Sequence, residues 1–131
     1  MRPNSPSNRP IVLLVDDDAD TLEMYELGLS GAGFLTVGTR DGMSVGLQVD
    51  AVHPDVVVTD LHLRGTTGWN VMQFLKTRDG AKAIPVVLLT GHSSDEIDQQ
   101  AQDLGCAAVL TKPCTPDELG VVLRRVLGAP A

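Results

Sequence analysis

The sequence is poor in aromatic residues and in cysteine. Aromatic side chains make up 3% of the 131 residues, so Val, Leu, Ile and Ala must build the core. The two cysteines, Cys106 and Cys114, are too few for a disulfide framework, and no histidines are spaced to complete a zinc site with them. We therefore expect two reduced, structural thiols and a cytoplasmic location.

Long apolar stretches are also missing. No segment approaches the length of a membrane span, and the opening residues MRPNSPSNRP lack the hydrophobic centre of a signal peptide. Because that segment is rich in Pro, Ser and Asn, we expect a disordered arm over residues 1–10. The remaining length suits one domain over residues 11–128, followed by a short tail at 129–131.

Positive charge is scarce as well. The chain holds 10 Lys and Arg against 17 Asp and Glu, which gives a net charge of −7. A nucleic-acid-binding surface needs basic residues to meet the phosphates, so this balance argues against direct nucleic-acid binding. A cation, or a basic peptide or protein, is the better-matched partner.

Five short apolar runs predict the strands of one sheet. They are nearly continuous rather than alternating, which is typical of strands that helices cover on both faces. The runs are Ile11–Val15, Phe34–Val37, Val56–Val58, Val86–Leu89 and Ala107–Leu110.

Between these runs, apolar residues recur at the three- and four-residue spacing of helices. The segment from Met43 to Ala51 fits this spacing least well, with only Met43, Leu47 and Ala51 in phase. The clearer helical faces comprise Leu22, Tyr25 and Leu29; Val71, Met72 and Leu75; Ile97, Ala101 and Leu104; and Leu119, Val122, Leu123 and Val126.

Helix boundaries are marked by capping residues. The segment TPDE at 115–118 combines a capping Thr, a Pro at the first helical position and a Glu three residues after the Thr. SSDE at 93–96 offers a second capping box, and Asp20 with Glu23 can begin the first helix. Strands and helices then alternate as five βα units, which predicts an α/β fold with a doubly wound parallel sheet. Glycines placed to end helices are Gly31, Gly33, Gly80 and Gly105.

Polar residues follow four of the five predicted strands. Ligands bind in the crevice at the carboxyl ends of such strands, so these side chains should meet at one site. Carboxylates there suit a hard cation such as Mg²⁺, while a hydroxyl and an ammonium suit an anionic oxygen. Together they fit phosphoryl transfer, with Asp60 as the nucleophile because it stands alone at the end of a central strand. The residues are Asp16, Asp17 and Asp18; Thr59 and Asp60; Thr90; and Thr111 and Lys112.

Simpler roles explain fewer of these residues. Asp16 and Asp17 could cap a helix, but Asp18 and Asp20 are available for capping, which leaves two further carboxylates for a metal. Asp60 could merely begin a turn. A direct role of the His62 imidazole as general base or ligand is the less favoured alternative to a solvent-facing side chain.

Four motifs, spread in order from about Ile11 to Leu127, resemble the receiver domain of two-component response regulators. They are LLVDDD at 13–18, VVVTDLHLRGTTG at 56–68, LLTG at 88–91 and LTKP at 110–113. The resemblance implies a flavodoxin-like (βα)5 fold with strand order 2-1-3-4-5. It also implies that Asp60 accepts a phosphoryl group from a histidine kinase or phosphotransfer protein, which makes the chain a phosphoacceptor rather than a turnover enzyme.

The same resemblance assigns roles to the other site residues. Asp17 and Asp60 would bind Mg²⁺ directly together with the backbone carbonyl of His62, and Asp16 would act through water. Thr90 would move toward the aspartyl phosphate, and Lys112 would pair with it. The switch would be read by an unknown downstream protein on the face of the fourth helix, fifth strand and fifth helix, through which the monomer could also form a homodimer.

Three positions depart from the family pattern. Val109 stands where a switch Tyr or Phe is usual, which favours, as an alternative, an interaction module that works without phosphorylation. Arg64 replaces a usual proline, so we expect a more mobile loop over 64–68. His62 occupies a position that influences loss of the phosphoryl group, so we expect an altered dephosphorylation rate.

Two kinds of enzyme on the same fold are less well supported. A flavin- or nucleotide-binding enzyme needs an anion cradle after the first strand, where the adjacent carboxylates at 16–18 would repel a phosphate. A Mg²⁺-dependent phosphatase would prefer a second Asp two residues after its nucleophile, and His62 occupies that position.

Overall fold

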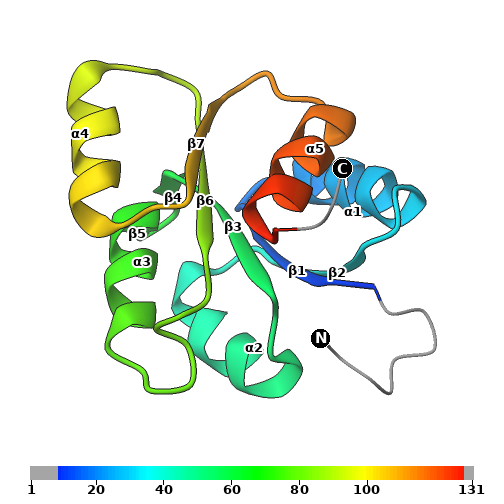
Figure 1. The fold of residues 1–131 in the computed structure, drawn as a ribbon, viewed down its shortest axis with the longest axis horizontal. Helices are drawn as coiled ribbons and strands as arrows, with labels where there is room; N and C mark the ends of the chain where they lie inside the picture. Colours follow the sequence, from blue (N-terminus) through cyan, green and yellow to red (C-terminus); the bar gives the residue numbers. More distant parts are fainter. Residues whose placement is uncertain (1–8, 129–131) are drawn as a thin grey trace.

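The predicted apolar runs form the five parallel strands of one sheet, shown in Figure 1. The structure, a computed structural model, describes residues 9–128. Along the sheet the order is β2-β1-β3-β6-β7, which is 2-1-3-4-5 when only these strands are numbered, so the predicted topology is confirmed. The strands are β1 (Ile11–Val15), β2 (Leu35–Thr39), β3 (Val56–Asp60), β6 (Val86–Thr90) and β7 (Ala108–Thr111).

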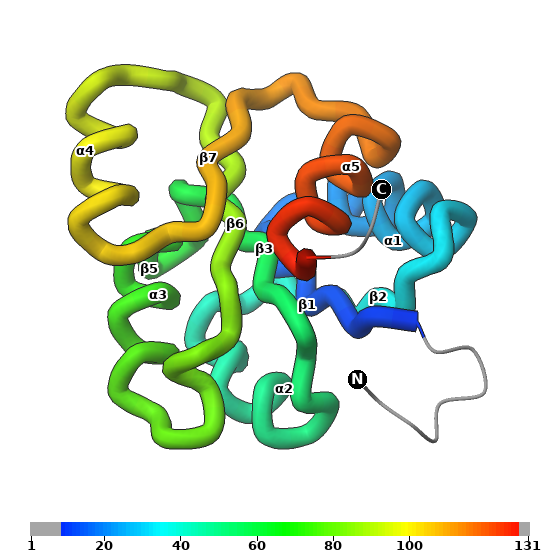
Figure 2. Tube along the Cα trace, in the orientation of Figure 1, coloured from blue at the N-terminus to red at the C-terminus, as the bar shows by residue number. Residues whose placement is uncertain are grey.

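Five α-helices cover the two faces of the sheet, as Figures 1 and 2 show. Helices α1 and α5 pack on one face, and α2, α3 and α4 pack on the other. The fold is therefore the predicted doubly wound α/β arrangement. The helices are α1 (Ala19–Gly31), α2 (Val45–Val52), α3 (Gly68–Lys76), α4 (Asp95–Leu104) and α5 (Pro116–Val126).

Alternate residues of β1 serve the two apolar layers. Val12 and Leu14 pack with the α1 and α5 side, whereas Leu13 and Val15 pack with the α2 and α3 side. All four are at most 2% exposed. Burying a Val or Leu side chain contributes roughly 1.5–3 kcal/mol relative to leaving it in water, so this strand anchors both layers.

Most helix starts use the predicted kind of capping residue. Thr115 caps α5 in a complete capping box with Glu118, as predicted. The cap of α4 is Ser94, which accepts from the backbone N–H of Ile97, so the box expected at 93–96 is wrong by one residue. Asp18, not Asp20, caps α1.

The predicted helix ends are partly wrong. Gly105 ends α4 in the left-handed region with φ 76°, as expected of a glycine stop. Gly31 is the last residue of α1, and Gly33 (φ 99°) lies just beyond it. The prediction for Gly80 is wrong, because α3 already ends at Lys76.

The buried face of α2 differs from the prediction. Met43 and Leu47 are 78% and 74% exposed, whereas Val45 and Val49 are buried. A short 3₁₀ helix, η1 (Gly42–Ser44), precedes α2, so Met43 lies outside the α-helix, and within α2 the valines rather than Leu47 face the sheet. The helical spacing of Met43 and Leu47 therefore predicted the wrong buried face for this segment.

Two further features were not predicted. The edge strands β2 and β7 remain partly exposed rather than covered on both faces, and Phe34 is fully buried just before β2 begins. After β3 the chain forms a small antiparallel hairpin, β4 (His62–Leu63) and β5 (Thr66–Thr67).

The chain ends lie largely outside the described residues, which exclude 1–8 and 129–131. Of the predicted arm, Pro10 is described, and its carbonyl accepts a hydrogen bond from the Leu35 N–H at 2.9 Å. Over residues 9–128, none of the helices combines the length and apolarity needed to cross a membrane.

Candidate functional site

The carboxyl ends of four neighbouring strands meet at one edge of the sheet. Asp16 directly follows β1, Asp60 is the last residue of β3, Thr90 is the last residue of β6, and Lys112 directly follows β7. Because β3 lies between β1 and β6 in a parallel sheet, these residues come from adjacent strand ends. The predicted convergence of polar side chains is therefore present.

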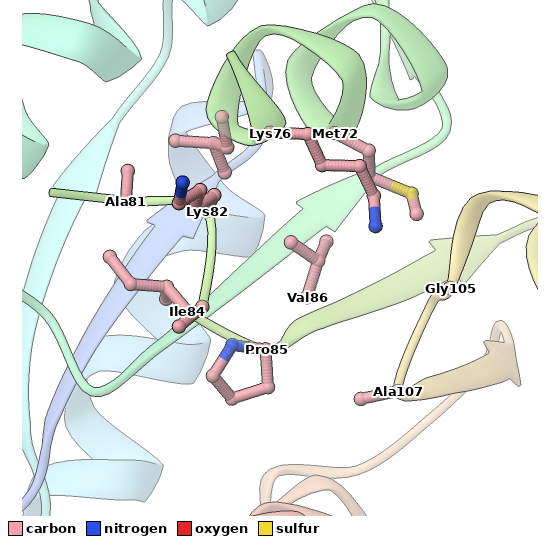
Figure 3. Close-up of a pocket in the computed structure, with 11 residues that line it drawn as sticks. Met72, Lys76, Ala81, Lys82, Ile84, Pro85, Val86, Gly105 and Ala107 are labelled. Atoms are coloured by element: carbon pink, nitrogen blue, oxygen red, sulfur yellow. The ribbon is translucent and has the colours of Figure 1, made fainter. Parts of the chain in front are cut away.

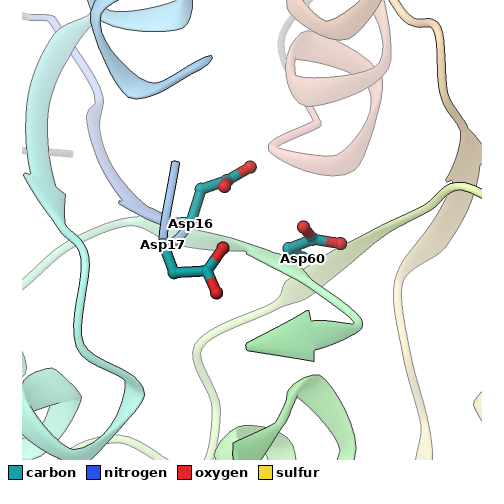
Figure 4. A group of neighbouring side chains, drawn as sticks. All are labelled: Asp16, Asp17 and Asp60. Atoms are coloured by element: carbon teal, nitrogen blue, oxygen red, sulfur yellow. The ribbon is translucent and has the colours of Figure 1, made fainter. Parts of the chain in front are cut away.

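Three carboxylates form the centre of the site, as Figure 4 shows. One oxygen from each of Asp16, Asp17 and Asp60 lies within 4.8 Å of the other two. The side chains of Asp16 and Asp60 are only 6% and 15% exposed. Like charges this close and this poorly hydrated repel one another, so a positive charge is needed between them.

Lys112 supplies one such charge. Its ammonium Nζ lies 3.1 Å from Oδ2 of Asp16 and 3.1 Å from Oδ2 of Asp60. Burial disfavours the charged lysine, but the hydrogen bonds to Asp60 and Asp16 and their negative charge outweigh it, so the pKa of Lys112 is raised above its ordinary value. The ammonium therefore stays charged and shared between the two carboxylates.

The oxygens of the three carboxylates are not equally available. Both oxygens of Asp16 are engaged, because Oδ1 accepts from the Asp18 N–H at 2.9 Å and Oδ2 accepts from Lys112. Asp17 has no hydrogen-bond partner for its carboxylate among the described residues. The donor set of three neighbouring carboxylates fits a hard divalent cation such as Mg²⁺, with Asp17 and Asp60 better placed than Asp16 to bind it directly.

Asp18 belongs to the helix rather than to this cluster. Its side chain accepts hydrogen bonds from the backbone N–H and the hydroxyl of Thr21, and it caps α1. The hydrogen bond from the Thr21 hydroxyl is the main reason that the pKa of Asp18 lies below its ordinary value. The three adjacent aspartates thus divide into two cluster members and one helix cap.

Thr90 lies at the site, but its hydroxyl does not bond to the carboxylates of the cluster. The side chain is fully buried, and its hydroxyl donates to the His92 carbonyl at 2.9 Å and accepts from the His92 N–H at 3.2 Å. Thr59 is likewise buried, and its hydroxyl donates to the Asp60 carbonyl at 3.0 Å. Neither hydroxyl donates to the Asp60 carboxylate in this conformation.

Of the three positions that depart from the family pattern, two lie in the hairpin after β3 and one lies within β7. His62 is exposed in β4, opposite Thr67. Arg64 lies in the turn of the hairpin, and Val109 is half-buried in β7 beside Leu88. The peptide bond between Lys112 and Pro113, which the sequence left open, is cis.

The sequence reading missed two residues beside the site. A Cβ on Gly68 would lie 2.7 Å from the Asp60 carbonyl oxygen, so only glycine allows α3 to begin this close to β3. The Nε of Arg40 donates to the Asp17 carbonyl at 3.1 Å. Arg40 directly follows β2, but the apolar run predicted for this strand ended at Val37, two residues before the strand itself ends, so the strand-end rule did not reach Arg40.

Two of the hollows in the described residues border the cluster. One, of about 290 Å³, is lined by Asp17, Arg40, Asp41 and Arg64, and the other, of about 260 Å³, includes Lys112. The hollow in Figure 3 lies at the opposite end of the sheet, because it includes Val86, the first residue of β6. Four residues of a strand rise about 13 Å, which separates this hollow from the carboxylates.

The sequence matches the profile of the response regulator receiver domain over residues 12–124. The DNA-binding response regulator MtrA of Mycobacterium leprae is 36% identical over 112 residues, which cover 85% of this chain and 48% of that protein. The phosphate regulon transcriptional regulatory protein PhoB of Escherichia coli is 31% identical over 116 residues, covering 88% of this chain and 51% of that protein. The chain thus spans about half the length of these relatives.

Solved structures agree with the sequence comparison. The chemotaxis response regulator CheY4 of Vibrio cholerae superposes with a TM-score of 0.83 at 27% identity, covering 90% of this chain and 98% of that one. A response regulator from Chloroflexus aurantiacus gives a TM-score of 0.84 at 28% identity, covering 92% and 98%.

Proposed function

Because this chain belongs to the response regulator receiver family, we propose that it is a two-component signalling receiver phosphorylated on Asp60. The phosphoryl donor is a phosphohistidine of a histidine kinase or phosphotransfer protein. The observation that carries the proposal is the position of Asp60, whose carboxylate lies within 4.8 Å of those of Asp16 and Asp17 and 3.1 Å from the Lys112 ammonium. A cytoplasmic location stays part of this proposal.

The transfer is a nucleophilic substitution at phosphorus. A carboxylate oxygen of Asp60 forms a bond to phosphorus while the P–N bond of phosphohistidine breaks, and the imidazole leaves with the electron pair of that bond. Lys112 lies 3.1 Å from Asp60, where its positive charge can stabilise the oxygens of the transferring group. Asp60 thereby becomes an aspartyl phosphate.

We assign the metal ligands from the availability of their oxygens. Asp17 and Asp60 would hold Mg²⁺ directly, while Asp16, whose oxygens are both engaged, would act through water. The backbone carbonyl of His62 joins them as a ligand on the family resemblance alone. Bound Mg²⁺ supplies positive charge that offsets the carboxylates and the anionic phosphoryl group.

Thr90 and Lys112 then respond to the new phosphate. The Thr90 hydroxyl leaves the His92 carbonyl and donates to a phosphoryl oxygen, so it exchanges one acceptor for another. Lys112 gives up its shared position between Asp16 and Asp60 and pairs with the phosphate. These two shifts move the loops that follow β6 and β7.

The output of the switch is a change on the face formed by α4, β7 and α5, where a downstream protein binds or a homodimer forms. Val109 has no ring to move between buried and exposed positions, so the change relies on the backbone after Thr90 rather than on an aromatic side chain. The protein assists its own phosphorylation and hydrolysis but is not a turnover enzyme.

Acetyl phosphate with Mg²⁺ tests the proposal when intact mass is followed over time. Wild-type protein should gain one phosphoryl group, Asp60→Asn should gain none, and a chelator should suppress the gain. Failure of the wild type, with the donor proven active on another receiver, would refute the function.

The same measurement tests the alternative function, an interaction module that works without phosphorylation. Val109 is the observation in its favour, and the full set of Asp17, Asp60, Thr90 and Lys112 at one site is the stronger observation against it. Partner binding that is unchanged in Asp60→Asn would support the runner-up.

A further inference from the structure

Exposed apolar side chains gather where η1 and α2 lie beside α3, on one face of the sheet (Figure 1). Met43 and Leu47 are 78% and 74% exposed, the highest values for large apolar residues within 9–128. Phe74 of α3 is 43% exposed, and with Met43 it lines a hollow of about 360 Å³ beside the hairpin. We call Met43, Leu47, Phe74 and this hollow the α2–α3 patch. Apolar side chains gathered in this way, unlike single ones, mark an interaction surface.

The patch is held in shape by contacts between its two helices. A Cβ on Gly46 would lie 2.8 Å from Cε2 and 2.9 Å from Cζ of Phe74, so the ring packs directly on the backbone of α2. The Cζ atom of Arg78 lies 5.3 Å from the centre of the same ring, and the Arg78 guanidinium pairs with Asp50 of α2. Because Phe74 is already ordered, a partner that covers it loses little conformational entropy.

The net charge of the chain lies outside this region. Residues 40–82 hold five Lys and Arg and five Asp, so they are neutral, and the remaining 5 basic and 12 acidic residues account for the whole charge of −7. Helix α1 carries three acidic residues and α4 carries four, and neither helix contains a Lys or Arg. Two copies of the chain therefore repel each other least where their α2–α3 patches meet.

Charges next to the patch also have opposite charges close by. Asp41 keeps its negative charge while it caps η1, and it shares the neighbouring hollow with Arg40 and Arg64. On the other side, Asp50 is paired with Arg78. The patch is thus an apolar centre with a mixed-charge border, and neither a strongly acidic nor a strongly basic partner is favoured there.

We propose that the α2–α3 patch docks on the same patch of a second copy of this chain, which gives a symmetric dimer. A twofold interface uses one surface on both sides, so that surface must offer projecting side chains as well as space to receive them. Met43 and Leu47 are the projecting side chains, and the hollow beside Phe74 is the space. This contact is separate from the face of α4, β7 and α5, and it forms without phosphorylation.

Sedimentation velocity of the unphosphorylated protein over a wide range of concentration tests the proposal. Wild type should change from monomer to dimer as its concentration rises. Met43→Asp and Leu47→Asp should each raise the dimer dissociation constant by at least about tenfold, because each places two unpaired carboxylates in a twofold interface. Added salt should tighten the wild-type dimer, since it screens the repulsion between two chains of charge −7.

Leu27→Asp and Val121→Asp are the matched controls. Leu27 of α1 is 70% exposed and Val121 of α5 is 59% exposed, so the same chemical change is made outside the patch. Both variants should keep the dissociation constant of wild type within about twofold, as is usual for exposed charges. Because Met43 and Leu47 are also exposed, all four variants should keep the circular dichroism spectrum of the folded protein.

Several results would overturn the inference. A wild type that is monomeric at every concentration would leave the patch to a different protein. A dimer that persists in Met43→Asp and Leu47→Asp, or that only Val121→Asp dissociates, would locate the contact elsewhere. A dimer that salt weakens would show that ion pairs, not apolar contact, hold it. None of these measurements involves a phosphodonor, so a failure here leaves the proposed phosphorylation of Asp60 untouched, and the reverse also holds.

Discussion

Helix α1 crosses the start of α5 so closely that Gly28 has no room for a side chain. A Cβ at this position would lie 2.3 Å from Cβ and 2.6 Å from Cγ of Pro116, whereas carbon atoms normally pack about 3.5–4.0 Å apart. Pro116 is the first residue of α5 and its ring cannot rotate away. Gly28→Ala therefore requires one helix to move by more than an ångström.

The expected cost follows from two opposing effects. Overpacking of a close contact costs about 1–3 kcal/mol, and a rigid ring as neighbour places Gly28→Ala near the upper value. Replacing glycine by alanine inside a helix gains back about 1 kcal/mol. The net loss in the free energy of unfolding should be about 2 kcal/mol.

Gly31→Ala is the internal control, because Gly31 lies in the same helix and a Cβ there would meet nothing within 4 Å. This variant should be neutral or gain up to about 1 kcal/mol, so only Gly28→Ala should lower the free energy of unfolding. Urea unfolding followed by circular dichroism at 222 nm measures both. With a slope of about 2 kcal/mol per molar urea, Gly28→Ala should lower the midpoint by about 1 M.

A Gly28→Ala variant as stable as wild type would refute the claim that α1 and α5 are held at this separation. The variant also tests the site, since Pro116 lies in the segment that follows Lys112. Displacement of α5 should move Lys112 and so slow phosphorylation, whereas Gly31→Ala should leave the phosphorylation rate unchanged.

Three other changes test the site and its surroundings. Asp18→Ala should lower the free energy of unfolding by about 1 kcal/mol through loss of the α1 cap, as urea unfolding would show, and should leave phosphorylation intact. Asp17→Ala should abolish Mg²⁺-dependent phosphorylation, as intact mass would show. His53→Gly should stabilise the fold by up to about 1 kcal/mol in thermal unfolding, because His53 holds a left-handed φ of 49°. The pKa of Lys112 is raised in the folded protein, so its charge should stabilise the fold fully at pH values below the ordinary pKa of lysine. This stabilisation should fall as the pH rises through the pKa that Lys112 has in the folded protein. A Lys112→Met variant should lack this loss of stability at alkaline pH.

The strand order and the position of the site could be predicted because both follow from strand ends. A buried apolar run that stops at Asp16 or Asp60 identifies the edge of the sheet at which a polar site can form. The family motifs then fixed the order of the strands, and the comparison with known receivers confirmed it.

Features that depend on which neighbour a side chain meets could not be predicted in the same way. Met43 and Leu47 are four residues apart, but so are Val45 and Val49, and only the packed structure shows that the valines form the buried face. The Thr90 hydroxyl donates to the His92 carbonyl, a partner that depends on the conformation of the loop after β6. Gly68 looked like a turn residue, although its role is to let backbone approach backbone.

The carboxylates lie at the edge of a sheet that separates two independent apolar layers, with α1 and α5 on one side and α2, α3 and α4 on the other. The hollow that includes Lys112 opens toward α1, and the hollow with Arg40 opens on the hairpin side. The edge of the sheet that carries the aspartates can therefore be reached from both of its faces, because neither helix layer closes over it.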